Sequence, residues 1–217
     1  MPDCSIDMPS RRGLLRATLA ALALPGAALA ASATPVVTML GDSITAGRGL
    51  PAALALPAQL QAALARRGVR ATVWGAGVSG DTSAAGLARV DFSVQADTRL
   101  CIVALGGNDL LQGLSPAAMR ANLDAIVRQL KARHIGVLLC GLAVPPRLNA
   151  AYARQFAAAF KAVAAAEHVP LYPDLLAGVA QRQALNQSDG IHPNAQGVRI
   201  IAERLAPAVA RALTGRA

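Results

Sequence analysis

Ser43 is the first residue along the chain whose type and position could support chemistry. It follows Gly41 and Asp42, which come directly after the apolar run 35–40. The run is partly β-branched and ends in turn-forming residues, so it predicts a short buried strand. Open α/β sheets bind ligands beyond the carboxyl ends of their strands, where Ser43 would lie. The alternative is that Asp42 and Ser43 only form a turn and cap the next helix.

A nucleophilic serine needs a base, and the chain contains three histidines. His134 and His168 each lie between a predicted helix and a predicted strand, where a cation is favourable and a structural role is expected. His192 lies in the irregular segment 188–194, three residues after Asp189. On a turn, that spacing can bring the carboxylate to the imidazole Nδ1 and hold one tautomer. The alternative is that both are ordinary residues of a turn before a helix.

Polar, glycine-rich segments follow the first three predicted strands. They are 41–43, 77–82 and 106–109. The carboxyl ends of parallel strands meet at one edge of a sheet, so we expect these segments to converge. A nucleophilic serine also needs donors for the oxyanion that develops on its substrate. The backbone amides of Ser43 and Gly80 and the side-chain amide of Asn108 would supply them.

Several common motifs are absent or misplaced. No phosphate-binding loop ending in Gly-Lys-Ser/Thr occurs, and no Gly-x-Ser-x-Gly is present, which excludes the nucleophile elbow of α/β-hydrolases. A Gly-x-Gly-x-x-Gly pattern spans 75–80, but it follows the second predicted strand and leads into no strong helix. We interpret it as a chance match and expect no nucleotide cofactor.

The elements that must position these residues alternate between strand and helix. Predicted strands are 35–40, 69–74, 100–105, 135–142 and 169–172. Predicted helices are 54–67, a short one ending at 87, 115–133, 149–167 and 195–213. This alternation indicates parallel strands joined by right-handed crossovers, hence an α/β fold, a three-layer α/β/α sandwich. With no repeat or linker in view, we expect one domain over 34–217.

Composition and charge agree with such a fold. The 217 residues are 54% hydrophobic but only 3% aromatic, which favours helices packed on a sheet over an aromatic-rich β sandwich. The formal net charge is +9, and the arginines that supply it are scattered. Without a basic block or aromatic residues to stack bases, we expect no nucleic-acid partner. A solvated basic surface is the simplest interpretation, and weak contact with an anionic membrane is the alternative.

The first 33 residues have the composition of an export signal. Arg11 and Arg12 precede a short apolar stretch and then small residues suited to cleavage after Ala30 or Ala33. The apolar stretch is shorter than the roughly 20 residues that span a bilayer. The paired arginines predict a twin-arginine signal, with an ordinary secretory signal as the alternative. Either one predicts a periplasmic or secreted protein.

The three cysteines predict no disulfide framework and no metal site. Cys4 would be removed with the signal. Cys101 and Cys140 each lie in an apolar run that predicts a strand, so we expect buried free thiols. A disulfide between them is the alternative in an oxidising compartment.

In their order along the chain, four segments resemble the sequence blocks of the SGNH (GDSL) hydrolase family. They are Gly41-Asp42-Ser43, the segment around Gly80, Gly106-Gly107-Asn108-Asp109 and Asp189-Gly190-Ile191-His192. Their flanking residues look like the arylesterase, thioesterase I and lysophospholipase L1 branch of that family. The resemblance covers essentially the whole chain after the signal. Arg48 departs from the pattern, because an aromatic residue is usual there, and this affects the expected shape of the substrate rim.

The resemblance implies a flavodoxin-like five-stranded sheet of order 2-1-3-4-5, no metal or cofactor, and a shallow open site. It assigns catalysis to Ser43, Asp189 and His192, and the oxyanion hole to Ser43, Gly80 and Asn108. It thus implies a serine esterase that forms an acyl-enzyme from a carboxylic ester, thioester or lysophospholipid.

The substrate itself is less defined than the catalytic residues. We expect the acyl chain of a small-molecule ester or lipid to lie along four apolar residues, namely Leu110, Leu111, Leu142 and Pro145. We also expect a monomer. The alternatives are a carbohydrate O-acetylesterase or an acyltransferase on the same scaffold, or a binding protein without catalysis.

Overall fold

The structure is a computed structural model that describes Met1 and residues 34–144 and 149–214. Five parallel strands form one sheet in the order β2-β1-β3-β4-β5. They are β1 (Val36–Gly41), β2 (Thr72–Gly77), β3 (Thr98–Ala104), β4 (Gly136–Cys140) and β5 (Leu171–Tyr172). The expected fold class and strand order are therefore confirmed.

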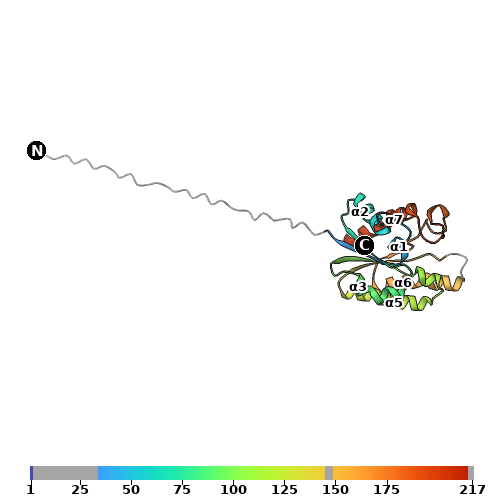
Figure 1. The fold of residues 1–217 in the computed structure, drawn as a ribbon. Coiled ribbons are helices and arrows are strands. Elements are labelled where there is room, and N and C mark those ends of the chain that lie inside the picture. Colours follow the sequence, from blue (N-terminus) through green and yellow to red (C-terminus); the bar gives the residue numbers. More distant parts are fainter. Residues whose placement is uncertain (2–33, 145–148, 215–217) are drawn as a thin grey trace. The chain divides into compact units, whose positions relative to one another are not determined.

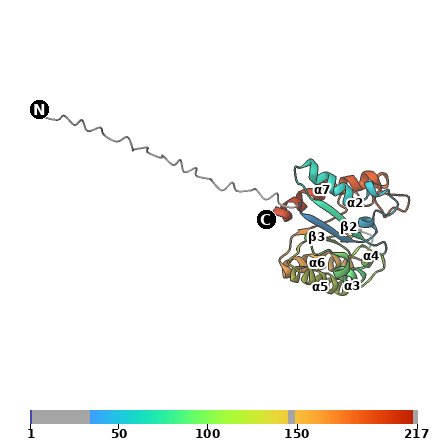
Figure 2. The ribbon, with the colours of Figure 1, turned by 60° about the vertical axis from the view of Figure 1, so that its left-hand side comes forward.

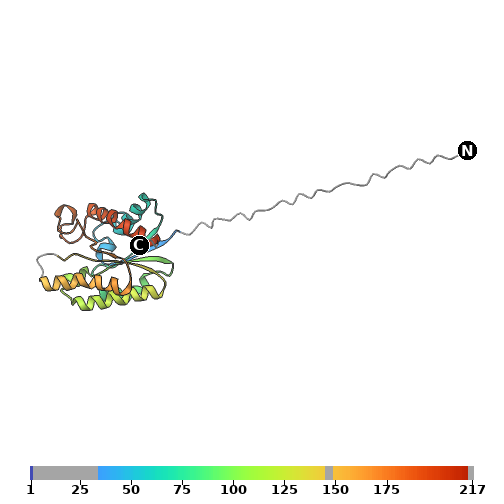
Figure 3. The ribbon, with the colours of Figure 1, turned by 180° about the vertical axis from the view of Figure 1, so that it is seen from behind.

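Helices cover both faces of this sheet. They are α1 (Ser43–Ala46), α2 (Leu56–Arg66), α3 (Ser83–Ser93), α4 (Gly107–Leu111), α5 (Pro116–Ala132), α6 (Ala150–Glu167) and α7 (Ala195–Thr214), with short 3-10 helices at Ala52–Leu54 and Gln183–Leu185. Helices α2 and α7 lie on one face, and α3, α5 and α6 lie on the other (Figures 1 and 2). Seen from behind, α5 and α6 run side by side beneath the sheet (Figure 3).

The sheet separates two hydrophobic cores, because successive side chains of a strand point to opposite faces. In β3, Leu100 and Ile102 pack against α2 and α7, whereas Cys101 and Val103 pack against α3, α5 and α6. All four side chains are at most 2% exposed. This explains why residues 100–104 of β3 are apolar without interruption: both faces of the strand are buried there.

The two described cysteines are free thiols, as the sequence predicts. Cys101 belongs to the core beneath α3, α5 and α6, and Cys140 belongs to the core beneath α2 and α7. Because the sheet lies between the two cores, the side chains point away from each other. Burial raises the pKa of each thiol to about 12.

The second strand begins three residues later than the sequence predicts. The N–H of Val69 donates to the carbonyl of Leu64 at 3.0 Å, and Gly68 adopts φ +73°, so this segment closes α2 instead of entering the sheet. The strand then continues through Gly77. A Cβ at Gly77 would overlap the backbone nitrogen of Ala46, so only glycine lets β2 approach α1 this closely.

The other differences are at element ends and in two short helices. Helix α3, predicted to end at residue 87, extends to Ser93. The fourth strand stops at Cys140 and not at residue 142, and the fifth is reduced to Leu171–Tyr172. Helices α1 and α4 are too short to produce a hydrophobic period and were not predicted. Among the helices that the structure describes, none has both the length and the apolar character needed to cross a membrane.

Candidate functional site

Ser43 is held at the end of β1 by a tight turn into α1. The Asp42 carboxylate caps that helix by accepting from the N–H of Ile44 at 3.0 Å, so Asp42 braces the loop. A Cβ on Gly41 would overlap the hydroxyl of Thr45, which explains the glycine at this position. Ser43 is therefore the first residue of a short helix, at the carboxyl edge of the sheet.

Ser43, His192 and Asp189 lie in one continuous hydrogen-bonded series. Ser43 Oγ is 2.8 Å from His192 Nε2, and His192 Nδ1 is 2.6 Å from Asp189 Oδ2. The other oxygen of Asp189 accepts from the backbone N–H groups of Ile191 and His192 at 2.9 and 3.0 Å. One carboxylate thus fixes both the loop that carries the histidine and the orientation of its ring.

The two carboxylates nearest Ser43 have opposite electrostatic environments. Hydrogen bonds from the backbone N–H and then the ring of His192, followed by the N–H of Ile191, hold the pKa of Asp189 well below its usual range. Burial raises the pKa of Asp42 to about 6, although the N–H of Ile44 opposes the change. Asp189 is therefore ionised at neutral pH, whereas Asp42 gains its charge only above mildly acidic pH.

Gly80 and Asn108 lie beside Ser43 on the wall of the same hollow. Gly80 adopts φ +91°, and Asn108 is the second residue of α4, which begins after Gly106 at φ +113°. The Asn108 side-chain amide donates to the carbonyl of Asp81 at 2.8 Å. That bond fixes the amide and leaves its second N–H available.

The hollow at this site has a volume of about 490 Å³ and is lined mainly by apolar side chains. Three of the four residues expected along the acyl chain line it, namely Leu110, Leu111 and Leu142. The fourth, Pro145, lies outside the described residues. Arg48 also lines the hollow, and its carbonyl accepts from the side chain of Gln187 at 2.8 Å.

The sequence analysis did not identify some of the residues that line the hollow, nor an arginine that lies beneath the site. Leu175, Leu176 and Ala180 line the hollow from the segment after β5, and the strand-end rule that located Ser43 could have located them. Arg89, which lies beneath the site on α3, was also missed. Its only sequence signal is a charged residue in a short, mainly apolar helix.

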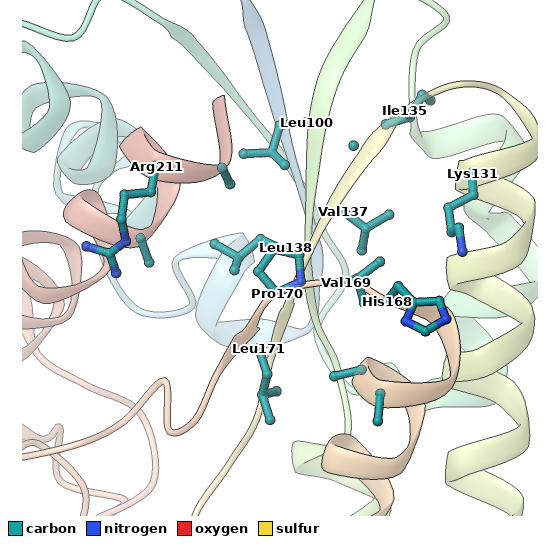
Figure 4. A pocket seen from close by; sticks show the side chains of 15 residues that line it. Leu100, Lys131, Ile135, Val137, Leu138, His168, Val169, Pro170, Leu171 and Arg211 are labelled. Carbon is teal, nitrogen blue, oxygen red and sulfur yellow. The ribbon is translucent and has the colours of Figure 1, made fainter. Parts of the chain in front are cut away.

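A second hollow lies at the other end of the sheet, at the start of β4 and before β5, with a volume of about 710 Å³. Figure 4 shows Arg211 of α7 on one side of it, and Lys131 and His168 on the other, with Leu138 and Pro170 between them. No serine or carboxylate lines it. His168 therefore has no nucleophile or orienting acid there, unlike His192.

Within residues 34–144 and 149–214, no three His, Cys, Asp or Glu side chains are grouped as metal ligands would be. The chemistry that the described residues offer is that of a serine beside a histidine whose other nitrogen contacts a carboxylate, with nearby amide donors. This arrangement suits nucleophilic attack on a carbonyl carbon.

Comparison with known proteins agrees with this chemistry. Residues 39–200 match the model of the GDSL-like Lipase/Acylhydrolase family. The chain is 39% identical to Esterase TesA of Pseudomonas aeruginosa over 163 residues, 75% of this chain and 81% of that protein. It is 34% identical to Thioesterase 1/protease 1/lysophospholipase L1 of Escherichia coli strain K12, over 81% of this chain and 84% of that protein.

A solved structure extends the likeness to the fold. The crystal structure of AlinE4, an SGNH-hydrolase family esterase, superposes with a TM-score of 0.69 at 44% identity, covering 83% of this chain and 97% of that one. The family match spans well over half of the chain, and the relatives exceed 30% identity over most of their length. The chain therefore belongs to the GDSL-like lipase/acylhydrolase family and is an ester hydrolase of the SGNH type.

Proposed function

We propose that Ser43, His192 and Asp189 form the catalytic triad of this hydrolase. His192 Nε2 removes the Ser43 proton as Oγ attacks the ester carbonyl carbon, and a tetrahedral intermediate forms. His192 then gives the proton to the leaving oxygen or sulfur, whose bond to carbon breaks. Water, deprotonated by His192, attacks the acyl-enzyme in turn and releases the acid and free Ser43.

The observation that carries this proposal is the unbroken contact series from Ser43 Oγ to Asp189. The hydroxyl is already within hydrogen-bonding distance of its base, at 2.8 Å. Asp189, which is ionised at neutral pH, stabilises the His192 cation that forms during attack. Asp42 lacks this role, because the second ring nitrogen of His192, Nδ1, is paired with Asp189 Oδ2.

We assign the oxyanion hole to three donors. The N–H of Ser43 is at the first position of α1, where helical amides have no intrahelical acceptor. The N–H of Gly80 and the free N–H of Asn108 complete the set. Donors fixed in place before the reaction stabilise the oxyanion without reorganisation, and one such donor is commonly worth about 10²–10³-fold in rate.

The shape and lining of the hollow favour an ester with an apolar acyl group. Leu110, Leu111 and Leu142 would contact the chain, and about 490 Å³ suits a small molecule. The substrate class follows as a carboxylic ester, with thioesters and lysophospholipids as members suggested by the names of relatives. We further propose that residues 1–33 are removed on export to the periplasm and that the enzyme acts as a monomer.

The test is the variant Ser43→Ala. Its turnover of p-nitrophenyl butyrate should fall roughly 10⁴–10⁶-fold, as it does when a triad nucleophile is removed. A fluorophosphonate probe should label the wild type at Ser43 and leave the variant unlabelled.

The matched control is Ser115→Ala, which removes an exposed serine cap from α5. This change should cost about 1 kcal/mol of stability and leave turnover within about twofold of wild type, since surface changes away from a site act little. Undiminished hydrolysis by a folded Ser43→Ala protein would refute the proposed triad.

A further inference from the structure

The Arg89 side chain makes four hydrogen bonds beneath the site. Its Nε donates to Asp81 Oδ2 at 2.6 Å, and its Nη2 donates to the carbonyl of Gly41 at 2.9 Å. Its Nη1 donates to the carbonyl of Ala76 at 2.9 Å and to Ser93 Oγ at 3.0 Å. The side chains of Arg89 and Asp81 are only 18% and 11% exposed, so this ion pair is largely desolvated.

Two of the acceptors of this guanidinium, the carbonyl of Gly41 and the carboxylate of Asp81, belong to segments that carry proposed oxyanion donors. Gly41 is two residues before Ser43, and Asp81 directly follows Gly80. The carbonyl of Asp81 accepts from the Asn108 amide at 2.8 Å. One planar cation thus contacts two of the three donor segments and reaches the third through a single residue.

We propose that Arg89 is a positioning residue for the reaction, which sets the spacing of the Ser43, Gly80 and Asn108 donors. The inference rests on the oxyanion roles proposed above. A guanidinium is a rigid fork whose donors diverge at fixed angles, so its acceptors are held in one geometry. Displacing a catalytic group by about 1 Å can cost about 10²-fold in rate.

An arginine whose contacts lie away from the site offers a comparison. The exposed pair between Arg66 and Glu203 joins α2 to α7 on the surface and touches no segment of the site. Arg89 instead contacts the carbonyls at the ends of β1 and β2, where those strands stop and the site begins. Its contacts therefore fix the donor segments relative to one another.

The first experiment compares Arg89→Lys with wild type. A lysine keeps the positive charge beside Asp81 but loses the fork, so kcat for p-nitrophenyl butyrate should fall about 10–100-fold while KM stays within about threefold. Arg66→Gln, which removes an exposed arginine, is the matched control and should retain wild-type kcat. Urea unfolding of each variant separates a loss of kcat from a loss of folded protein.

The second experiment combines Arg89→Lys with Asn108→Ala. In the wild-type background, Asn108→Ala should lower kcat about 10²–10³-fold. In the Arg89→Lys background, Asn108→Ala should lower kcat by less than about 10-fold further. A donor that is already misplaced stabilises the transition state less, so its removal has a smaller effect. A stabilising role alone predicts that the two losses multiply.

Two results would overturn the inference: unchanged kcat in Arg89→Lys, or fully multiplicative losses in the double variant. The proposed oxyanion hole fails separately, if Asn108→Ala alone leaves kcat unchanged. The two failures are therefore distinguishable, since the second is measured with Arg89 intact.

Discussion

Asp42 and Asp189 show how environment separates two identical side chains near one serine. Asp42 is 6% exposed, whereas the Asp189 side chain is 41% exposed and accepts three hydrogen bonds. Burial favours the neutral form of Asp42, and hydrogen bonds favour the charged form of Asp189. The same site therefore contains Asp189, which is ionised at neutral pH, and Asp42, whose pKa is raised to about 6.

This difference predicts a pH-dependent stability for Asp42. Its pKa is raised from 3.8 to about 6, so the folded state holds the proton more tightly than the unfolded state. The resulting stability is full below about pH 4 and is lost as pH rises through 6. Since a tenfold difference in proton affinity is worth about 1.4 kcal/mol, the loss approaches about 3 kcal/mol.

The variant Asp42→Asn measures this loss, because asparagine keeps the capping oxygen and cannot ionise. Relative to wild type, its free energy of unfolding in urea should rise by up to about 3 kcal/mol between pH 4 and pH 8. The exposed Asp97→Asn serves as control and should track wild type. Parallel curves for Asp42→Asn and wild type would contradict the prediction.

The charge of Arg48 at the rim of the hollow predicts a preference for esters of anionic alcohols. Arg48 lines the hollow, and its carbonyl accepts a hydrogen bond from Gln187 in the segment that leads to His192. We predict that its cation contacts the alcohol part of the ester. An exposed charge pair is worth about 0.2–1 kcal/mol, or up to about fivefold in rate. For each protein, kcat/KM is measured for an ester of an anionic alcohol and for an ester of a neutral alcohol, and the first value is divided by the second. Arg48→Gln should lower this ratio by up to about fivefold. The same ratio in Arg48→Gln and wild type would exclude this preference.

At the scale of elements, the site depends on how closely β2 approaches α1. A Cβ at Gly77 would lie 2.7 Å from the carbonyl oxygen of Asp42 and would overlap the nitrogen of Ala46. Gly77→Ala must then displace the helix that carries Ser43. We expect a loss of about 1–3 kcal/mol in stability and a fall in kcat of at least about 10-fold.

The control for this prediction is Gly68→Ala at the end of α2. Gly68 has positive φ but open space around its Cα, so the change strains the backbone without moving α1. Gly68→Ala should lower the free energy of unfolding by about 1 kcal/mol and leave kcat unchanged. If Gly77→Ala matched this control in both measurements, the close approach would have no effect on the site.

Elements also explain what the sequence could and could not reveal. The parallel sheet and the segment that carries each candidate site residue were predictable, because the polar segments follow buried runs and parallel strands end at one edge. The strand order came from the family resemblance and not from the pattern. The start of β2 was not predictable, because Val69 continues the apolar pattern while its N–H bonds back to Leu64. The role of Arg89 was not predictable either, because three hydrogen bonds to residues outside α3, and no pattern in the sequence, define its place.

At the scale of the whole molecule, residues 2–33 lie outside the described part, and the role of the first 33 residues remains a prediction from the sequence. Cell fractionation should detect a shortened form in the periplasm. Replacing Arg11 and Arg12 with lysines should block export through a twin-arginine route, which requires the arginine pair. Continued export of that variant would indicate the general secretory route.

Substrate preference is also a property of the whole molecule, because the residues that line the hollow come from several elements of the fold. Purified protein should be compared on short p-nitrophenyl esters, acyl-CoA, lysophospholipid and acetylated sugar. An apolar lining predicts that kcat/KM rises with acyl length until the hollow is filled, by up to about 0.8 kcal/mol for each added methylene. A preference for acetyl groups on sugars would instead favour the O-acetylesterase alternative.

The position of one free thiol in each core has a consequence for measuring motion. A thiol with a pKa of about 12 reacts with alkylating reagents only when its surroundings open. With Cys4 replaced, Cys140→Ala leaves a reporter beneath α3, α5 and α6, and Cys101→Ala leaves one beneath α2 and α7. Their alkylation rates would report how often each helical layer opens, and unequal rates would reveal a partly unfolded state in which only one layer has detached.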